Sequence, residues 1–327
     1  MIDVAGPSTG GGTSAEFEGE VEVLTRRTES AGVISLELTR PSGEPLPSWA
    51  PGAHVDLVLP NGLTRQYSLC GRVEDAKTWR IGVLREPEGR GGSEWVHDHA
   101  HEGARVTVRG PRNHFPLLGS PRYLFIGGGI GITPLLPMIA RVHAAGADWR
   151  LFYGGRVRGS MAFLDELEDY GDRVTLQPQD ELGMLDLAGI LGEPDEETLV
   201  YCCGPTGLID AVERQCESWP KGSLHVERFT NALAPAEDNT EVEVELRASG
   251  ITLTVPPELS ILEAVENAGV NVLKSCAEGT CGTCETSVLE GEVDHRDAVL
   301  TDDEKAENDT MMICVSRARC GRLVLDL

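Results

Sequence analysis

The organisation of this chain can be worked out from one stretch, Cys276-Ala-Glu-Gly-Thr-Cys281-Gly-Thr-Cys284, which Cys314 follows after twenty-nine residues. The first three cysteines have the spacing C-x4-C-x2-C, and with a distant fourth they form the ligand pattern of a plant-type [2Fe–2S] centre. Such a centre needs four thiolates, two for each iron, because iron in this state selects soft sulfur ligands.

Three other interpretations of these cysteines are a zinc site, a disulfide pair and buried structural thiols. Zinc sites usually have two close cysteine pairs, whereas this loop has a triplet with a four-residue first gap. Gly279 and Gly282 also suit a loop that wraps a cluster, since glycine adopts backbone conformations closed to other residues. We therefore expect an iron–sulfur centre held by these four cysteines.

The composition indicates a globular protein of two to three domains, with 327 residues, 40% hydrophobic and 25% charged. The sequence contains no run of eighteen apolar residues, so it predicts no transmembrane helix. The start of the chain is polar and Gly-rich, which predicts a flexible tail over 1–16 and no signal peptide. Nine cysteines without an export signal favour a reducing cytoplasm. The five remaining cysteines are expected to be small buried hydrophobes: Cys70, Cys202, Cys203, Cys216 and Cys320.

The net charge of −25 is unevenly distributed along the chain. Residues 237–327 contain 20 acidic against 7 basic side chains, residues 118–231 contain 17 against 9, and residues 17–117 contain 14 against 12. This excess makes nucleic acid an unsuitable partner. The negative charge of residues 237–327 would attract a basic patch on another protein. A role in keeping the protein soluble explains the same charge equally well.

Residues 17–117 predict a small antiparallel β-barrel. Apolar residues alternate over 21–24 and 33–38, and further short strands over 51–59, 65–69, 79–85 and 105–108 are separated by Gly and Pro turns. Asn61-Gly62 between two of these strands is a hairpin signal.

Two pieces of this barrel predict a flavin site. Arg65-Gln66-Tyr67-Ser68 places a guanidinium, an aromatic ring and a hydroxyl on one strand. Gly89-Arg-Gly-Gly-Ser93 precedes a helix expected over 94–100, where backbone N–H groups would cradle a phosphate. The alternative for the second piece is an ordinary loop in which Ser93 caps the helix.

Residues 118–231 alternate strands and helices, which predicts a parallel α/β domain with ligands at the carboxyl ends of its strands. The apolar strand 123–126 runs into Gly127-Gly-Gly-Ile-Gly-Ile-Thr-Pro134 and a helix over 135–143, the arrangement that lays a pyrophosphate on a helix N-terminus. Later helices are expected over 161–170 and 208–219, and strands over 149–153, 174–176 and 199–203.

We place a linker at 232–240 and a third domain at 241–327. The segments 241–246 and 251–255 alternate strictly and predict a hairpin. Ser260 and Glu263 predict a capping box for a helix ending near Ala268. After the cysteine loop we expect strands over 287–293, 311–315 and 322–325.

Two further motifs are Pro111-Arg-Asn-His-Phe115 and Tyr201-Cys-Cys-Gly-Pro205. As an ordered set with those above, they make residues 20–327 resemble the phthalate dioxygenase reductase family, and also the reductase portion fused to some bacterial haem-thiolate monooxygenases. The resemblance implies an FMN-binding β-barrel, an NAD(P)H-binding α/β domain and a C-terminal ferredoxin domain of the β-grasp type. It also implies a reductase that takes hydride from NAD(P)H and passes single electrons through the cluster to a separate oxygenase.

The site residues implied by the resemblance fall into three groups. The FMN site would comprise Arg65, Gln66, Tyr67, Ser68, Val83, Leu84, Arg90, Gly91, Gly92 and Ser93. The nicotinamide nucleotide would lie on Gly127, Gly128, Gly129, Gly131, Thr133, Gly204 and Pro205. Ser68, Cys203 and Phe229 would lie where hydride is transferred, although Phe229 could instead be a core residue.

Coenzyme choice is expected at the end of the second strand of the α/β domain. No carboxylate occurs between Tyr153 and Asp165, whereas Arg156, Arg158 and Ser160 could hold a ribose 2′-phosphate. The alternative is that both arginines lie on a solvated loop. Two other functions remain open, a non-enzymatic ferredoxin-type carrier and a stand-alone NAD(P)H oxidase or flavin reductase.

Overall fold

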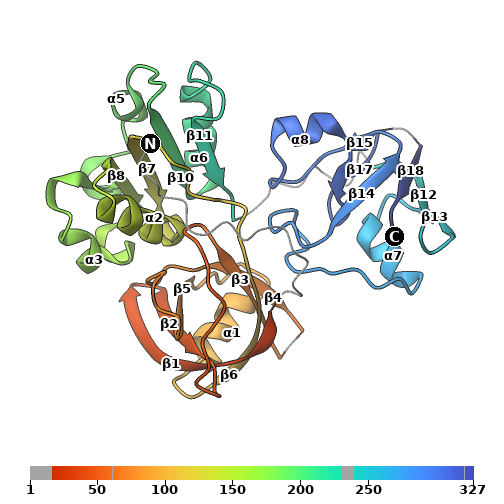
Figure 1. Cartoon of the computed structure of the whole chain (residues 1–327), viewed down its shortest axis with the longest axis horizontal. Coiled ribbons are helices and arrows are strands. Elements are labelled where there is room, and N and C mark those ends of the chain that lie inside the picture. The colour runs from red at the N-terminus through yellow and green to blue at the C-terminus, as the bar shows by residue number, and fades with distance from the viewer. Residues whose placement is uncertain (1–16, 61, 230–238, 320) are drawn as a thin grey trace. The chain divides into compact units, whose positions relative to one another are not determined.

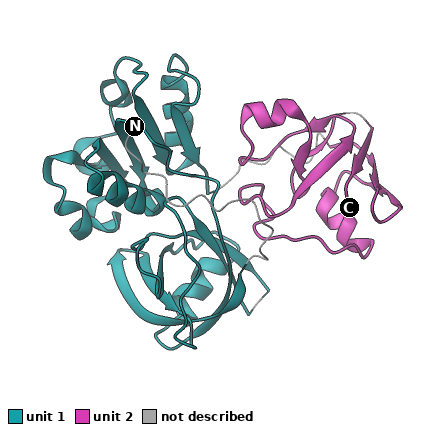
Figure 2. Ribbon diagram, in the orientation of Figure 1, with its two compact units in different colours: residues 1–229 teal, residues 230–327 magenta. Residues whose placement is uncertain are grey.

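The computed structural model describes residues 17–60, 62–229, 239–319 and 321–327. Its contacts divide the chain into two compact units, residues 1–229 and 230–327 (Figure 2). The predicted tail over 1–16, Asn61 of the predicted hairpin, most of the predicted linker and Cys320 lie outside the described residues.

The first half of unit 1 is the predicted antiparallel barrel (Figure 1). Its strands are paired in the order β4 (Thr64–Ser68), β3 (His54–Val58), β6 (Arg105–Arg112), β1 (Glu18–Ser30), β2 (Val33–Thr39) and β5 (Thr78–Leu84). A bridge between Leu69 and Ile81 joins the two outer strands, and the Cys70 N–H donates to the Arg80 carbonyl at 2.8 Å. The sheet is therefore closed.

The barrel interior is filled by the alternating apolar side chains that the sequence places on one face of each strand. Leu36, Val55, Leu57 and Ile81 are completely buried, as period-two alternation requires. Helix α1 (Gly92–His99) adds Val96 to the same core.

The second half of unit 1 is the predicted parallel sheet, with one strand, β11 (Leu224–Glu227), that the sequence analysis did not predict. Its order is β11 (Leu224–Glu227), β10 (Thr198–Cys203), β7 (Arg122–Gly128), β8 (Asp148–Gly155) and β9 (Val174–Pro178). The connections carry α2 (Ile132–Ala144), α3 (Leu164–Glu168), α4 (Gln179–Leu182), α5 (Leu187–Leu191) and α6 (Thr206–Gln215). All strands point the same way, so their carboxyl ends form one edge on which Gly128, Cys203 and Glu227 lie.

The helix boundaries differ from the predicted ones for local reasons. Helix α2 begins at Ile132 instead of Leu135, because Pro134 is compatible with a first helical turn. Helix α6 begins at Thr206, just after Pro205. Helix α3 covers only half of the predicted 161–170: Met161 is extended and Phe163 has φ 62°, so neither residue can belong to a helix.

Unit 2 contains a mixed sheet in the order β13 (Ile251–Val255), β12 (Val242–Leu246), β18 (Arg322–Leu325), β14 (Glu285–Glu290) and β16 (Thr310–Met312). The predicted hairpin is confirmed as β12 and β13, and the Ser260 capping box as the start of α7 (Ile261–Asn267). Strand β14 starts two residues earlier than predicted and ends before Gly291, whose φ is 107°.

Two features of unit 2 escaped the prediction. Helix α8 (Asp302–Glu307) begins with a second capping box, formed by Thr301 and Glu304. The short strands β15 (Val293–Asp294) and β17 (Arg317–Ala318) pair with each other. Strand β16, expected over 311–315, covers only Thr310–Met312. Within the described ranges, no helix combines the length and apolarity that a bilayer crossing requires.

Candidate redox site

The four predicted ligand cysteines come together in unit 2. Cys276, Cys281 and Cys284 lie on the loop between α7 and β14, and Cys314 follows β16; all four are buried and none forms a disulfide. The thiol of Cys276 contacts those of Cys281 and Cys314, and the thiol of Cys284 contacts Cys314. Hydrogen bonds among these thiols lower the pKa of Cys276 and Cys284 and raise the pKa of Cys281 and Cys314, because the four side chains lie close together.

The backbone of the cysteine loop directs N–H groups toward a cysteine sulfur. Gly279 and Gly282 both have φ 71°, and Ala277 has φ 54°, so the chain turns repeatedly through left-handed conformations. These turns aim the N–H groups of Glu278 and Thr280 at the Sγ of Cys276, at 3.3 and 3.5 Å. Converging thiols and inward N–H groups fit a [2Fe–2S] cluster.

The predicted flavin residues meet in the barrel of unit 1. A Cβ at Gly92 would lie 2.4 Å from Nε of Arg65, so the Gly-rich loop lies directly against strand β4. Side-chain atoms of that strand are buried without a hydrogen-bond partner among the described residues, namely Oη of Tyr67 and Nε2 of Gln66. Burying such groups is costly unless a partner is present, so these residues fit a polar ligand such as FMN.

The start of α1 provides the phosphate side of this site. Gly91, with φ 79°, is the N-cap of α1, and no side chain caps the helix. The alternative in which Ser93 caps the helix is therefore wrong; its Oγ instead accepts from the Glu86 N–H at 3.0 Å. Val83 is buried, and its carbonyl accepts a hydrogen bond from Nε2 of His97 at 3.0 Å. Leu84 is half-buried beside it, and Arg90 is exposed.

The two predicted nucleotide loops also meet. A Cβ at Gly131 would lie 2.3 Å from the Cys203 carbonyl oxygen, and one at Gly128 would lie 2.7 Å from Cδ of Pro205. Only glycine permits this approach, which brings the two loops together at the start of α2, and a helix N-terminus favours a pyrophosphate. Sequence reasoning missed Tyr153, whose hydroxyl donates to the Gly129 carbonyl at 3.1 Å.

The barrel and the parallel sheet contact each other near these loops. A Cβ at Gly82 of β5 would lie 2.7 Å from Cγ2 of Thr133. Arg80 of β5 forms an ion pair with Glu166 of α3, and its guanidinium lies 5.2 Å from the ring centroid of Phe163. The flavin strands and the nucleotide loop are therefore held in direct contact within unit 1.

Ser68 and Cys203 meet a third group that sequence reasoning missed, the carboxyl of Glu227 at the end of β11. Cys203 Sγ lies 4.0 Å from Glu227 Oε2. Burial of the carboxyl raises the pKa of Glu227 from 4.5 to about 8, and the nearby Ser68 hydroxyl has a smaller opposing effect. Burial also raises the pKa of the Cys203 thiol. The sequence did contain a signal for this residue: Glu227 is a carboxylate two residues before Phe229, at the end of a strand, where parallel sheets bind their ligands.

Phe229 ends unit 1 and is 37% exposed, so the alternative that it is a core residue is wrong. An exposed aromatic ring at the end of this sheet is free to contact a bound ring system.

The loop expected to choose the coenzyme already contains a carboxylate contact. Arg158 is exposed, and its guanidinium donates to both carboxylate oxygens of Glu181 in α4, at 2.9 and 3.2 Å. The Asp180 N–H donates to the Arg156 carbonyl at 3.2 Å, and Ser160 Oγ donates to the Val157 carbonyl at 2.8 Å. The loop itself contains no carboxylate, but Glu181 of α4 places one beside Arg158.

Comparison with known proteins identifies two kinds of domain in this chain. The model of the 2Fe-2S iron-sulfur cluster binding domain matches residues 244–319, and that of the oxidoreductase NAD-binding domain matches residues 125–214. The chain is 45% identical over 297 residues to the phenoxybenzoate dioxygenase subunit beta of Ectopseudomonas oleovorans, covering 90% of this chain and 93% of that protein. It is 39% identical over 313 residues to the phthalate dioxygenase reductase of Burkholderia cepacia, covering 94% and 97%.

Solved structures show the same relationship. A phthalate dioxygenase reductase, described as a modular structure for electron transfer from pyridine nucleotides to [2Fe-2S], superposes with a TM-score of 0.72 at 38% identity over 95% of this chain and 98% of that one. An intact type IV self-sufficient cytochrome P450 monooxygenase superposes with a TM-score of 0.88 at 42% identity, over 95% of this chain but 41% of that one.

The fold and the sites define an NAD(P)H-dependent flavin and iron–sulfur oxidoreductase. Its sites fit the cofactors FMN, a [2Fe–2S] cluster and NAD(P)H. The chain belongs to the phthalate dioxygenase reductase family.

Proposed function

We propose that this chain is the reductase component of an oxygenase system, taking electrons from NAD(P)H and delivering them singly to a separate oxygenase. The observation that carries this proposal is the joint presence, in one chain, of a nucleotide cradle, a flavin-type site in contact with it and four converging thiols. When bound, FMN supplies the conversion between two-electron and one-electron transfer, for which amino-acid side chains have no equivalent.

The barrel residues would bind and orient FMN. Among the described residues, the Tyr67 hydroxyl and the Gln66 amide nitrogen are buried without a hydrogen-bond partner, and the N-terminus of α1 offers N–H groups to a phosphate. The glycine loop that precedes α2 would bind the pyrophosphate of NAD(P)H, with Gly204 and Pro205 as its opposite wall.

Ser68, Cys203 and Glu227 would shape the place where nicotinamide reacts. Glu227 can hold or release a proton near neutral pH, because its pKa is about 8. The Ser68 hydroxyl would lie beside this carboxyl. Cys203 stays a neutral thiol that adds no charge.

The acceptor would meet the acidic iron–sulfur part of the chain through a basic patch. Residues 237–327 carry 20 acidic against 7 basic side chains, and complementary charge raises the rate of encounter.

The test is cofactor content and reduction by NAD(P)H. We expect one FMN, two irons and two sulfides per chain in fully reconstituted protein, and reduction of both centres by NAD(P)H in the absence of oxygen. If FAD is extracted instead of FMN, the assignment of FMN as the flavin cofactor is wrong. A protein that loads iron but binds no flavin would be a ferredoxin-type carrier, and the proposal would fail.

A further inference from the structure

The cysteine loop is supported by a segment that holds no ligand, residues 295–301 between β15 and α8. The Ala298 N–H of this segment donates to the carbonyl of Gly279, inside the cysteine loop, at 2.9 Å. The segment has no regular secondary structure, so its shape depends on side-chain hydrogen bonds.

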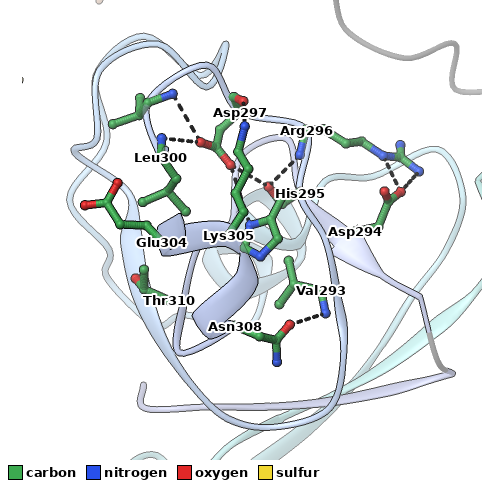
Figure 3. A network of polar contacts seen from close by, with 12 residues as sticks. Val293, Asp294, His295, Arg296, Asp297, Leu300, Glu304, Lys305, Asn308 and Thr310 are labelled. Carbon is green, nitrogen blue, oxygen red and sulfur yellow. Dashed lines mark hydrogen bonds and ion pairs between the residues drawn. The ribbon is translucent and has the colours of Figure 1, made fainter. Parts of the chain in front are cut away.

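Those hydrogen bonds converge on Asp297, whose side chain is completely buried (Figure 3). Its Oδ2 accepts from the N–H groups of Val299 and Leu300, at 3.1 and 2.8 Å. Its Oδ1 accepts from Oγ of Ser316 at 3.4 Å. Ser316 itself accepts from the Arg296 N–H at 3.2 Å, so its hydroxyl hydrogen remains available for Asp297.

Asp297 therefore connects both ligand-bearing parts of unit 2. One side of it shapes the segment that bonds to Gly279, between the ligands Cys276 and Cys281. The other side bonds to Ser316, two residues beyond the ligand Cys314.

The charge of Asp297 is balanced by dipoles more than by cations. Among the described residues, the basic group within 4 Å of its carboxylate is His295, whose Nδ1 lies 3.8 Å from Oδ1. Burial lowers the pKa of His295, so its ring is neutral at neutral pH. Lys305 donates to the backbone carbonyl of Asp297, at 3.0 Å, and Arg296 pairs with Asp294.

We propose that Asp297 is a positioning residue for the iron–sulfur centre, one that fixes the loop around Gly279 and whose buried charge lowers the reduction potential of the centre. A negative charge held in a medium of low polarity opposes the arrival of an electron nearby. Net charge and hydrogen bonding around a cluster are the quantities through which a protein sets its potential. This inference rests on the cluster and not on the identity of the oxygenase.

The experiment is a redox titration of the cluster, followed by electron paramagnetic resonance, in the full-length protein loaded with FMN and iron. Asp297→Asn keeps the size of the side chain and removes its charge. The control, Asp302→Asn, removes an equal charge at an exposed position in the first turn of α8. We expect a more positive midpoint potential and a changed resonance line shape for Asp297→Asn, and wild-type values for the control.

Equal potentials in wild type and Asp297→Asn, or equal shifts in both variants, would overturn the proposal. If Asp297→Asn retains no iron, Ser316→Ala is measured instead. That variant keeps the carboxylate and removes one of its donors, so a potential below that of wild type supports the proposal and an unchanged one refutes it. Because no acceptor protein takes part, failure here leaves the proposed function untouched.

Discussion

Glu227 is the residue whose protonation has the clearest consequence. Its carboxyl is protonated in the folded chain up to about pH 8, whereas in the unfolded chain it ionises from about pH 4.5. Between these values the unfolded state binds fewer protons than the folded state. The contribution of Glu227 to stability therefore falls as pH rises from 4.5 toward 8, a cost that a structural role alone does not explain.

We predict that Glu227→Gln removes a pH dependence from the reaction with NAD(P)H. In wild type, the rate of flavin reduction by NAD(P)H should decline above about pH 8, where the carboxyl loses its proton. The glutamine variant should show no such decline. Stopped-flow absorbance across pH 6 to 10 measures both, with the exposed Glu217→Gln as control. The same decline in all three proteins would show that Glu227 does not control the rate of flavin reduction.

At the level of elements, the pairing of the loop after β8 with α4 explains what the sequence could and could not predict. Alternation and glycine spacing revealed the barrel, the parallel sheet and the nucleotide loop, because those signals are local. The Arg158–Glu181 pair joins residues twenty-three positions apart, and the Cys203–Glu227 contact joins neighbouring parallel strands. Neither has a local signature. The same limit applies to helix α3, because the local sequence does not predict the left-handed conformation of the buried Phe163.

We predict that this pairing sets the coenzyme preference. A 2′-phosphate would have to compete with Glu181 for Arg158, so wild type should accept both NADPH and NADH. Glu181→Gln should favour NADPH, and Arg158→Asp should favour NADH, each by on the order of fivefold, since exposed ion pairs are weak. Values of kcat/KM for both coenzymes decide the matter. A large NADH preference that neither substitution alters would show that this loop does not contact the ribose.

The whole molecule combines nearly neutral flavin-binding residues with a strongly acidic iron–sulfur end. We predict that the rate of electron delivery to the cognate oxygenase falls steeply with ionic strength, because salt screens the encounter of opposite charges. Flavin reduction by NAD(P)H, which involves no partner protein, should change little. Delivery rates independent of salt from about 0.05 to 0.5 M would favour solubility as the reason for the acidic residues.

The central claim is that electrons pass from NAD(P)H through unit 1 and leave by way of the four cysteines. It is tested most directly by Cys314→Ser, which removes one thiolate of the cluster, with Cys216→Ser as a control at a buried cysteine of unit 1. In rapid mixing of flavin-loaded protein with NAD(P)H and a one-electron protein acceptor, Cys314→Ser should keep wild-type flavin reduction and lose electron delivery. The control should keep both. Undiminished delivery by Cys314→Ser, or collapse of flavin reduction together with delivery in the folded variant, would contradict this order of electron transfer.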